Sequence, residues 1–76
     1  MELEQYKKQI GEQLRMERRL RELSQLGVAE AIGVSSKSVM IGERGEVSLD
    51  ILYAYATWLG LDWLKLTKNA WGWSDE

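Results

Sequence analysis

The stretch from Gln25 to Gly45 constrains the fold more than any other part of the chain. It has the pattern of two short helices joined by a turn of three residues, and helices connected so tightly need particular residue types where they touch. Ala29 is small enough for a second helix to cross it, Gly33 can take the left-handed conformation that ends a helix sharply, and Val39 can point back as an apolar anchor. The spacing predicts two helices that meet at a steep angle, with the second projecting outward.

Helical spacing and helix-end signals continue on both sides of this pair. Near the N-terminus, Tyr6, Ile10 and Leu14 recur at four-residue steps, which is typical of a surface helix with one apolar stripe. The candidate N-caps are Ser24, Ser35, Ser48 and Asp62, and the candidate terminating glycines are Gly33 and Gly60. The expected helices span residues 3–21, 25–32, 36–44, 49–59 and 62–67, followed by an irregular tail over residues 68–76.

The aromatic residues are expected to divide between core and surface. Tyr53 falls on the apolar face of the fourth expected helix, and Trp58 and Trp63 are expected in the core. Residues two positions apart on a helix diverge by about 200°, so Tyr53 and Tyr55 cannot both face the core. The tryptophans of the tail could fold back onto the domain, pack across a dimer interface or stay exposed. The possible dimer-interface residues are Tyr55, Trp71 and Trp73.

Length and composition exclude several classes of protein. A chain of 76 residues predicts a single domain, because neither half could bury a core of its own. It contains neither cysteine nor histidine, which argues against a disulfide framework, a zinc site and an enzyme that relies on either residue. We expect no cofactor, no metal and no small-molecule substrate. The charged N-terminus and the lack of a long apolar run predict a cytoplasmic protein that makes no contact with a membrane.

The ordered motifs resemble the Cro/CI-type (XRE-like) helix-turn-helix regulators of phages and bacteria. The resemblance covers residues 10–66 and is carried by Ile10, Gly11, Leu14, Arg15, Arg18, Leu23, Ser24, Gln25, Ala29, Gly33, Val34, Ser35, Val39, Glu43, Arg44 and Gly45. It implies an all-α, five-helix, lambda-repressor-like DNA-binding domain in a bacterial or phage-infected cell. It also implies a recognition helix in the major groove of double-stranded DNA and a homodimer on a near-palindromic operator.

The resemblance implies roles for individual residues. Gln25 corresponds to the phosphate clamp, and Arg18 and Glu43 correspond to a pair that ties the first helix to the end of the recognition helix. Lys37 stands where a side chain could reach a guanine, and Ile41 where it could pack on a thymine methyl group. The expected DNA-binding residues are Gln25, Ser35, Ser36, Lys37, Met40, Ile41 and Arg44; the expected structural residues are Arg18, Glu43, Ala29, Gly33 and Val39.

Several features depart from the family's pattern and leave a second function open. Gly42 replaces a large apolar residue, a loss worth about 2–3 kcal/mol, and Glu22 replaces a glycine. The net charge is −2, whereas a DNA-binding protein usually displays a basic face. The alternative is a protein-binding module on the same fold, antirepressor or antitoxin-like, that sequesters another regulator. The lysines and arginines of the first helix could contact phosphate or form a solvated face.

Overall fold

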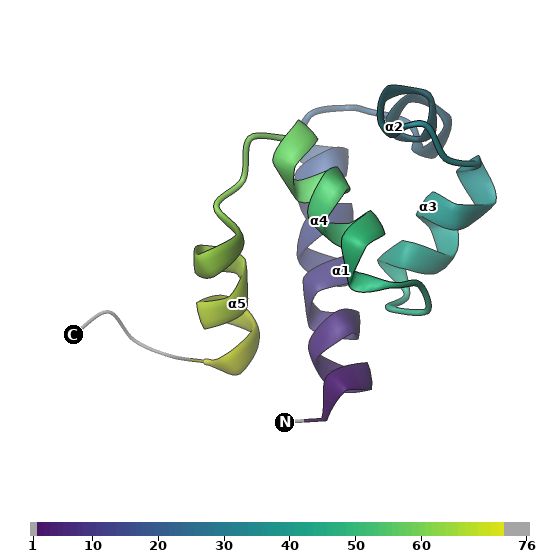
Figure 1. The fold of residues 1–76 in the computed structure, drawn as a ribbon. Helices are drawn as coiled ribbons and strands as arrows, with labels where there is room; N and C mark the ends of the chain where they lie inside the picture. The colour runs from purple at the N-terminus through teal and green to yellow at the C-terminus, as the bar shows by residue number, and fades with distance from the viewer. Residues whose placement is uncertain (1, 73–76) are drawn as a thin grey trace.

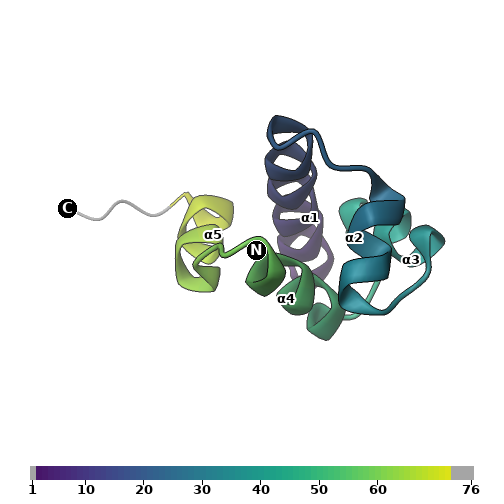
Figure 2. The ribbon, with the colours of Figure 1, turned by 90° about the horizontal axis from the view of Figure 1, so that it is seen from above.

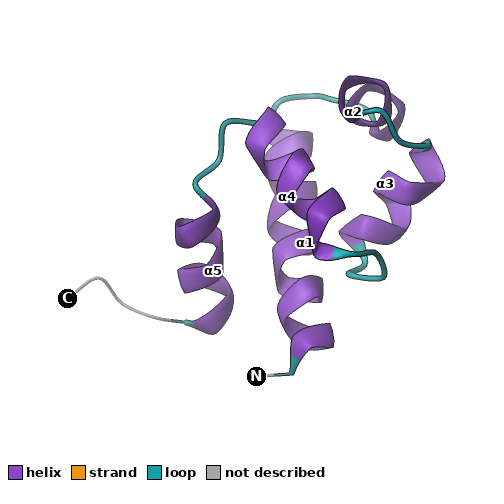
Figure 3. Ribbon diagram, viewed as in Figure 1, coloured by secondary structure: helices purple, strands orange, loops and turns teal. Residues whose placement is uncertain are grey.

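The computed structural model describes residues 2–72, which form five α-helices and no strand (Figures 1 and 3). The helices are α1 (Leu3–Leu20), α2 (Gln25–Ile32), α3 (Ser36–Glu43), α4 (Leu49–Trp58) and α5 (Trp63–Trp71). Figure 2 shows α1 in the middle of the molecule, with α5 on one side and α2 and α3 on the other. The predicted all-α architecture is therefore confirmed for these residues.

Three of the four predicted N-cap side chains form a capping hydrogen bond. The side chains of Ser24, Ser35 and Asp62 each accept a hydrogen bond from a backbone N–H in the first turn of α2, α3 and α5. Ser48 precedes α4, but its side chain makes no such bond. Its hydroxyl instead bonds to Asp50, which lowers the pKa of that carboxyl. The prediction that the Ser48 side chain caps the backbone of α4 is wrong, because its hydroxyl is hydrogen-bonded to the Asp50 carboxylate instead.

The C-terminal end of α2 is as predicted, those of α1, α3 and α4 lie one residue earlier than predicted, and that of α5 lies four residues later. Gly33 ends α2 and Gly60 follows α4, both at positive φ, as predicted. The irregular tail expected from residue 68 is wrong, because α5 continues to Trp71. Ala70 lies one turn beyond Leu66 on the buried face, so this last turn adds to the core. Residues 73–76, including Trp73, lie outside the described residues.

All five helices contribute side chains to the core. Ala29 and Val39 are fully or almost fully buried and hold α2 against α3 across the connecting residues 33–35, as predicted. Gly42 is also buried, and a Cβ atom built on it would lie 3.1 Å from Val47 Cγ2 and 3.6 Å from Leu52 Cδ2. These two side chains occupy the space that a larger residue at position 42 would fill.

The backbones of α1 and α3 approach each other closely at two glycines. A Cβ atom at Gly11 would lie 2.5 Å from the carbonyl oxygen of Gly42, and one at Gly45 would lie 2.5 Å from the backbone nitrogen of Lys8. No side chain fits at either contact without moving one of the two elements. The two glycines therefore fix the height and distance at which α3 lies against α1.

Two aromatic residues lie elsewhere than the sequence predicts. Trp58 is 44% exposed, because the inward position at this end of α4 is taken by the buried Leu59. Tyr53 is 55% exposed, whereas Tyr55 is completely buried. Tyr53 instead packs edge-on against Trp63, with ring centroids 5.5 Å apart. The prediction that Trp63 packs against the core is confirmed.

Candidate nucleic-acid interface

A buried polar cluster fixes the inner side of α3. Arg18 in α1 donates from Nε to Oε2 of Glu43 at 2.7 Å and from Nη2 to Oε1 at 3.1 Å. Tyr55 in α4 donates its hydroxyl to the same Oε2 at 2.6 Å, and Gln25 at the start of α2 donates its side-chain amide to Oε1 at 3.2 Å. The predicted structural pair of Arg18 and Glu43 is therefore present, and it connects four helices rather than two.

The hydrogen bonds of this cluster set its protonation states. Burial alone would raise the pKa of the Glu43 carboxyl, but the hydrogen bonds from Arg18, Tyr55 and Gln25 outweigh it and lower the pKa below its ordinary value. Burial raises the pKa of the Tyr55 hydroxyl, and its bond to Glu43 raises it further. Glu43 is therefore a carboxylate at neutral pH, and Tyr55 keeps the proton it donates.

Tyr55 is excluded from any dimer interface by this contact. Its side chain is fully buried within one chain, between Glu43 and the backbone of α1, where its hydroxyl also reaches the carbonyl oxygen of Leu14 at 3.5 Å. A residue without exposed surface cannot meet a second copy. Trp71, a second residue predicted for this interface, is 40% exposed.

The outer side of α3 carries the residues predicted to read DNA. Lys37, Ile41 and Arg44 recur at four- and three-residue steps, so they share the face opposite Val39. Lys37 and Arg44 are exposed, and Ile41 is half-buried. Ser36 is exposed at the start of the helix. The arrangement places two cations on either side of one apolar side chain.

The other residues predicted to bind DNA lie outside this stripe: Ser35 caps α3, and Met40 and Gln25 line a hollow beside it. The Ser35 hydroxyl accepts the backbone N–H of Ser38 at 3.0 Å and lies 2.9 Å from the Ser38 hydroxyl, so its bonds serve the start of α3. Met40 in α3 and Gln25 at the start of α2 line a hollow together with Arg44. The predicted set therefore forms two adjoining surfaces that share Arg44.

Sequence reasoning left the role of Arg15 open, and the fold gives it a location. Arg15 lies in α1 and lines the same hollow as Gln25, Met40 and Arg44. Two sequence signals bear on this location: Arg15 belongs to the motif of the resemblance, and it lies three residues before Arg18, on a neighbouring part of the helix surface.

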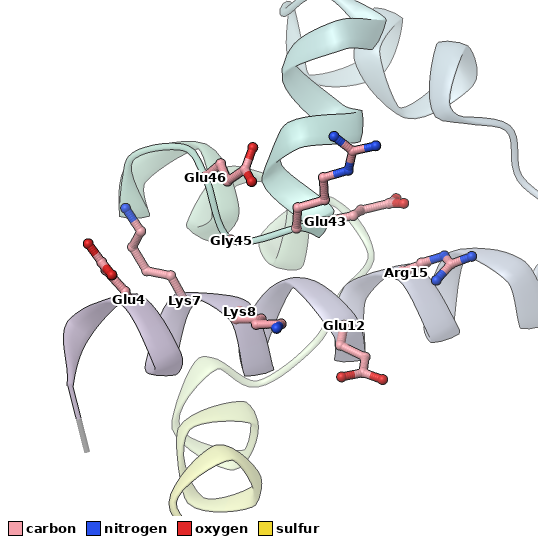
Figure 4. A pocket seen from close by; sticks show the side chains of 9 residues that line it. Glu4, Lys7, Lys8, Glu12, Arg15, Glu43, Gly45 and Glu46 are labelled. Carbon is pink, nitrogen blue, oxygen red and sulfur yellow. The ribbon is translucent and has the colours of Figure 1, made fainter.

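A wider groove of about 760 Å³ continues from this hollow along α1. Its walls are α1 and the segment that follows α3, and it mixes both signs of charge (Figure 4). Lys7 points toward the segment after α3, whereas Glu12 points to the opposite side of α1 (Figure 4). The groove is lined by Glu4, Lys7, Lys8, Glu12, Arg15, Glu43, Arg44, Gly45 and Glu46.

Residues 2–72 contain neither a membrane-spanning helix nor a cluster of metal ligands. No helix there is long and apolar enough to span a bilayer. No group of three or more histidine, cysteine, aspartate or glutamate residues there could hold a metal ion. In comparisons with known proteins, no protein-family model, no curated protein and no solved structure matches the chain.

Proposed function

We propose that this chain is a sequence-specific DNA-binding transcriptional regulator with a helix-turn-helix domain of the Cro/CI, lambda-repressor-like type. The observation that carries the proposal is the outer side of α3, where Lys37, Ile41 and Arg44 form one exposed or half-exposed stripe while Val39 anchors the opposite side. An α-helix with one free side of this kind fits the major groove of B-DNA.

The stripe supplies chemistry for both base and backbone contacts. Lys37, near the start of α3, donates to guanine O6 or N7, and Ile41 one turn later packs on a thymine methyl group. Arg44 at the end of the helix and Gln25 at the start of α2 contact phosphates. Two copies of the chain would read half-sites about 34 Å apart on a near-palindromic operator.

A lysine substitution tests the proposal. Lys37→Ala removes a base contact and should weaken binding to DNA selected from a random pool by about 1–3 kcal/mol, with relaxed preference at one base pair. Lys65→Ala is the matched control, because Lys65 is also exposed but lies on α5. Equal affinities of the two variants, measured by fluorescence anisotropy, would show that α3 does not read the operator.

The exposed apolar residues favour a second candidate, a protein-binding module of the antirepressor or antitoxin type. Met16 is 60% and Leu20 is 76% exposed along a groove between α1 and α5, and such surface often marks a protein partner. A gel shift with random duplex DNA at about 50 mM salt separates the two functions, because even non-specific DNA binding is strong under these conditions. Complete absence of a shift would favour the protein-binding module.

A further inference from the structure

The side of α4 that faces away from α1 is uncovered and mostly apolar. Figures 1 and 2 show α1 behind α4 and no described helix on its other side. The exposed residues of α4 recur at steps of three and four and so form one face: Asp50, Tyr53, Ala54, Thr57 and Trp58. Asp50 is the only charged residue of the helix. A helix with apolar residues on all sides is normally covered on all sides, and residues 2–72 leave this face of α4 open.

The shape of this face suits a second helix. Tyr53 is 55% and Trp58 is 44% exposed, and the two lie about 140° apart around the helix axis. The small residues Ala54 and Thr57 lie between them, so another helix can approach the backbone of α4 while the two rings pack on either side of it. Trp63 packs edge-on against Tyr53 and extends the surface onto α5. Exposed aromatic side chains of this kind are typical of the centre of a protein interface.

The charges at the two ends of α4 indicate which helix fits there. Asp50 is exposed at the N-terminal end. At the C-terminal end, Arg21 of α1 donates to the carbonyl oxygen of Leu59 and keeps 40% of its side chain exposed. Two copies of α4 laid antiparallel bring the Asp50 of each copy to the Arg21 of the other, and their helix dipoles oppose each other. The face is therefore complementary in charge to itself.

We infer that the outer face of α4 binds a second copy of the chain, with the two α4 helices antiparallel and the two Ala54 residues at the two-fold axis. The inference rests on the proposed function and deepens it, because a near-palindromic operator is read by two copies. The contact uses Tyr53 and Ala54 in place of Tyr55, whose side chain is buried. One helix face is smaller than the interface of a permanent dimer, so we expect a dissociation constant in the micromolar range.

Charge variants at position 54 test this contact in sedimentation equilibrium without DNA. Ala54→Glu and Ala54→Lys each place two like charges at the two-fold axis, so each should weaken self-association by at least about tenfold. An equimolar mixture of the two variants brings opposite charges together and should restore association to about the wild-type level. Both substitutions keep a good helix former at an exposed position of α4. The matched control is Ala31→Glu, the same change at an exposed alanine of α2, which should leave the dissociation constant unchanged.

Three results would overturn the inference. A wild-type chain that stays monomeric at about 1 mM leaves the face of α4 to a different protein, as the second candidate function requires. Equal dissociation constants for Ala54→Glu and Ala31→Glu place the contact on another face. A mixture of the two Ala54 variants that stays monomeric excludes the antiparallel pairing.

The gel shift at about 50 mM salt keeps these results separate from the proposed function. A monomeric wild-type chain that still shifts DNA leaves the proposed function standing without this interface. A dimer that responds to charge at Ala54 but shifts no DNA confirms the interface and contradicts the proposed function.

Discussion

On the inner side of α3 the charged groups meet partners within the chain, whereas on the outer side and flank the cations meet none among residues 2–72. Glu43 holds Arg18 and Tyr55 on the inner side, while Lys37 and Arg44 face outward. The difference lies in the surroundings, since Arg18 and Arg44 are chemically alike and only Arg18 meets a buried carboxylate. Substitutions on the inner side should therefore change stability, and those on the outer side should change binding.

The largest expected effect is that of Glu43→Ala. It leaves the 12%-exposed Arg18 side chain without its carboxylate and Tyr55 without its acceptor, so we expect a loss of about 3–5 kcal/mol in the free energy of unfolding. Urea denaturation measures the loss. The control is Glu30→Ala, which removes an exposed carboxylate from α2 and should change the free energy by less than about 0.5 kcal/mol. Equal losses for the two variants would abolish the distinction between the two sides.

A smaller effect is expected at high pH from Tyr55. The pKa of its hydroxyl is raised in the folded state above its ordinary value of 10.0, so its contribution to stability is complete below pH 10 and decreases above it. Tyr55→Phe should cost about 1–2 kcal/mol at pH 7. That difference from wild type should shrink by about 1 kcal/mol between pH 10 and pH 11.

Tyr53→Phe controls for the substitution itself, because it removes a hydroxyl from a side chain that is 55% exposed. Its free energy of unfolding at pH 7 should stay within about 0.5 kcal/mol of wild type. A gap between wild type and Tyr55→Phe that stays constant from pH 9 to pH 11 would show that the hydroxyl of Tyr55 is accessible to ionisation in the folded protein.

The sequence predicts those parts of the structure that depend on neighbouring residues. Ser24 and Gly33 bracket α2 as predicted, because a cap and a left-handed turn involve only the adjacent backbone. The extension of α5 was also encoded locally, since Ala70 continues the buried face of Leu66 and Gly72 at positive φ ends the helix. An apolar residue at position 70 followed by a glycine at position 72 predicts a helix that ends near residue 71, by the same rule that ends α2 at Gly33.

Contacts between distant segments could not be derived in this way. The choice between Tyr53 and Tyr55 for the core depends on Glu43, which lies twelve positions before Tyr55 and accepts its hydrogen bond only once α3 and α4 have packed. Arg15 and Arg19 are equivalent as cations in the sequence of α1. Both are exposed, and only the close approach of α3 at Gly11 makes Arg15, and not Arg19, line the same hollow as Arg44.

The smallest expected effect concerns the turn after α1, where neither side of α3 is involved. Glu22 has φ 56°, the only positive φ at a non-glycine residue in the described part of the chain. A side chain in this conformation costs about 1–2 kcal/mol, which glycine would avoid. Part of that gain in stability is lost, because glycine also raises the entropy of the unfolded state. We expect Glu22→Gly to raise the free energy of unfolding by about 1 kcal/mol, which corresponds to about 4–8 °C in the unfolding midpoint of a domain this small.

Glu22→Ala separates backbone strain from charge, because it removes the carboxylate and keeps the Cβ atom. It should leave the midpoint close to that of wild type, whereas an increase equal to that of Glu22→Gly would assign the gain to charge. The affinity of Glu22→Gly for DNA and its salt dependence should equal those of wild type, because Glu22 lines neither the hollow nor the groove of Figure 4. A variant that is more stable but binds equally well would show that the turn holds the fold without setting the position of α3, which the glycine contacts with α1 already fix.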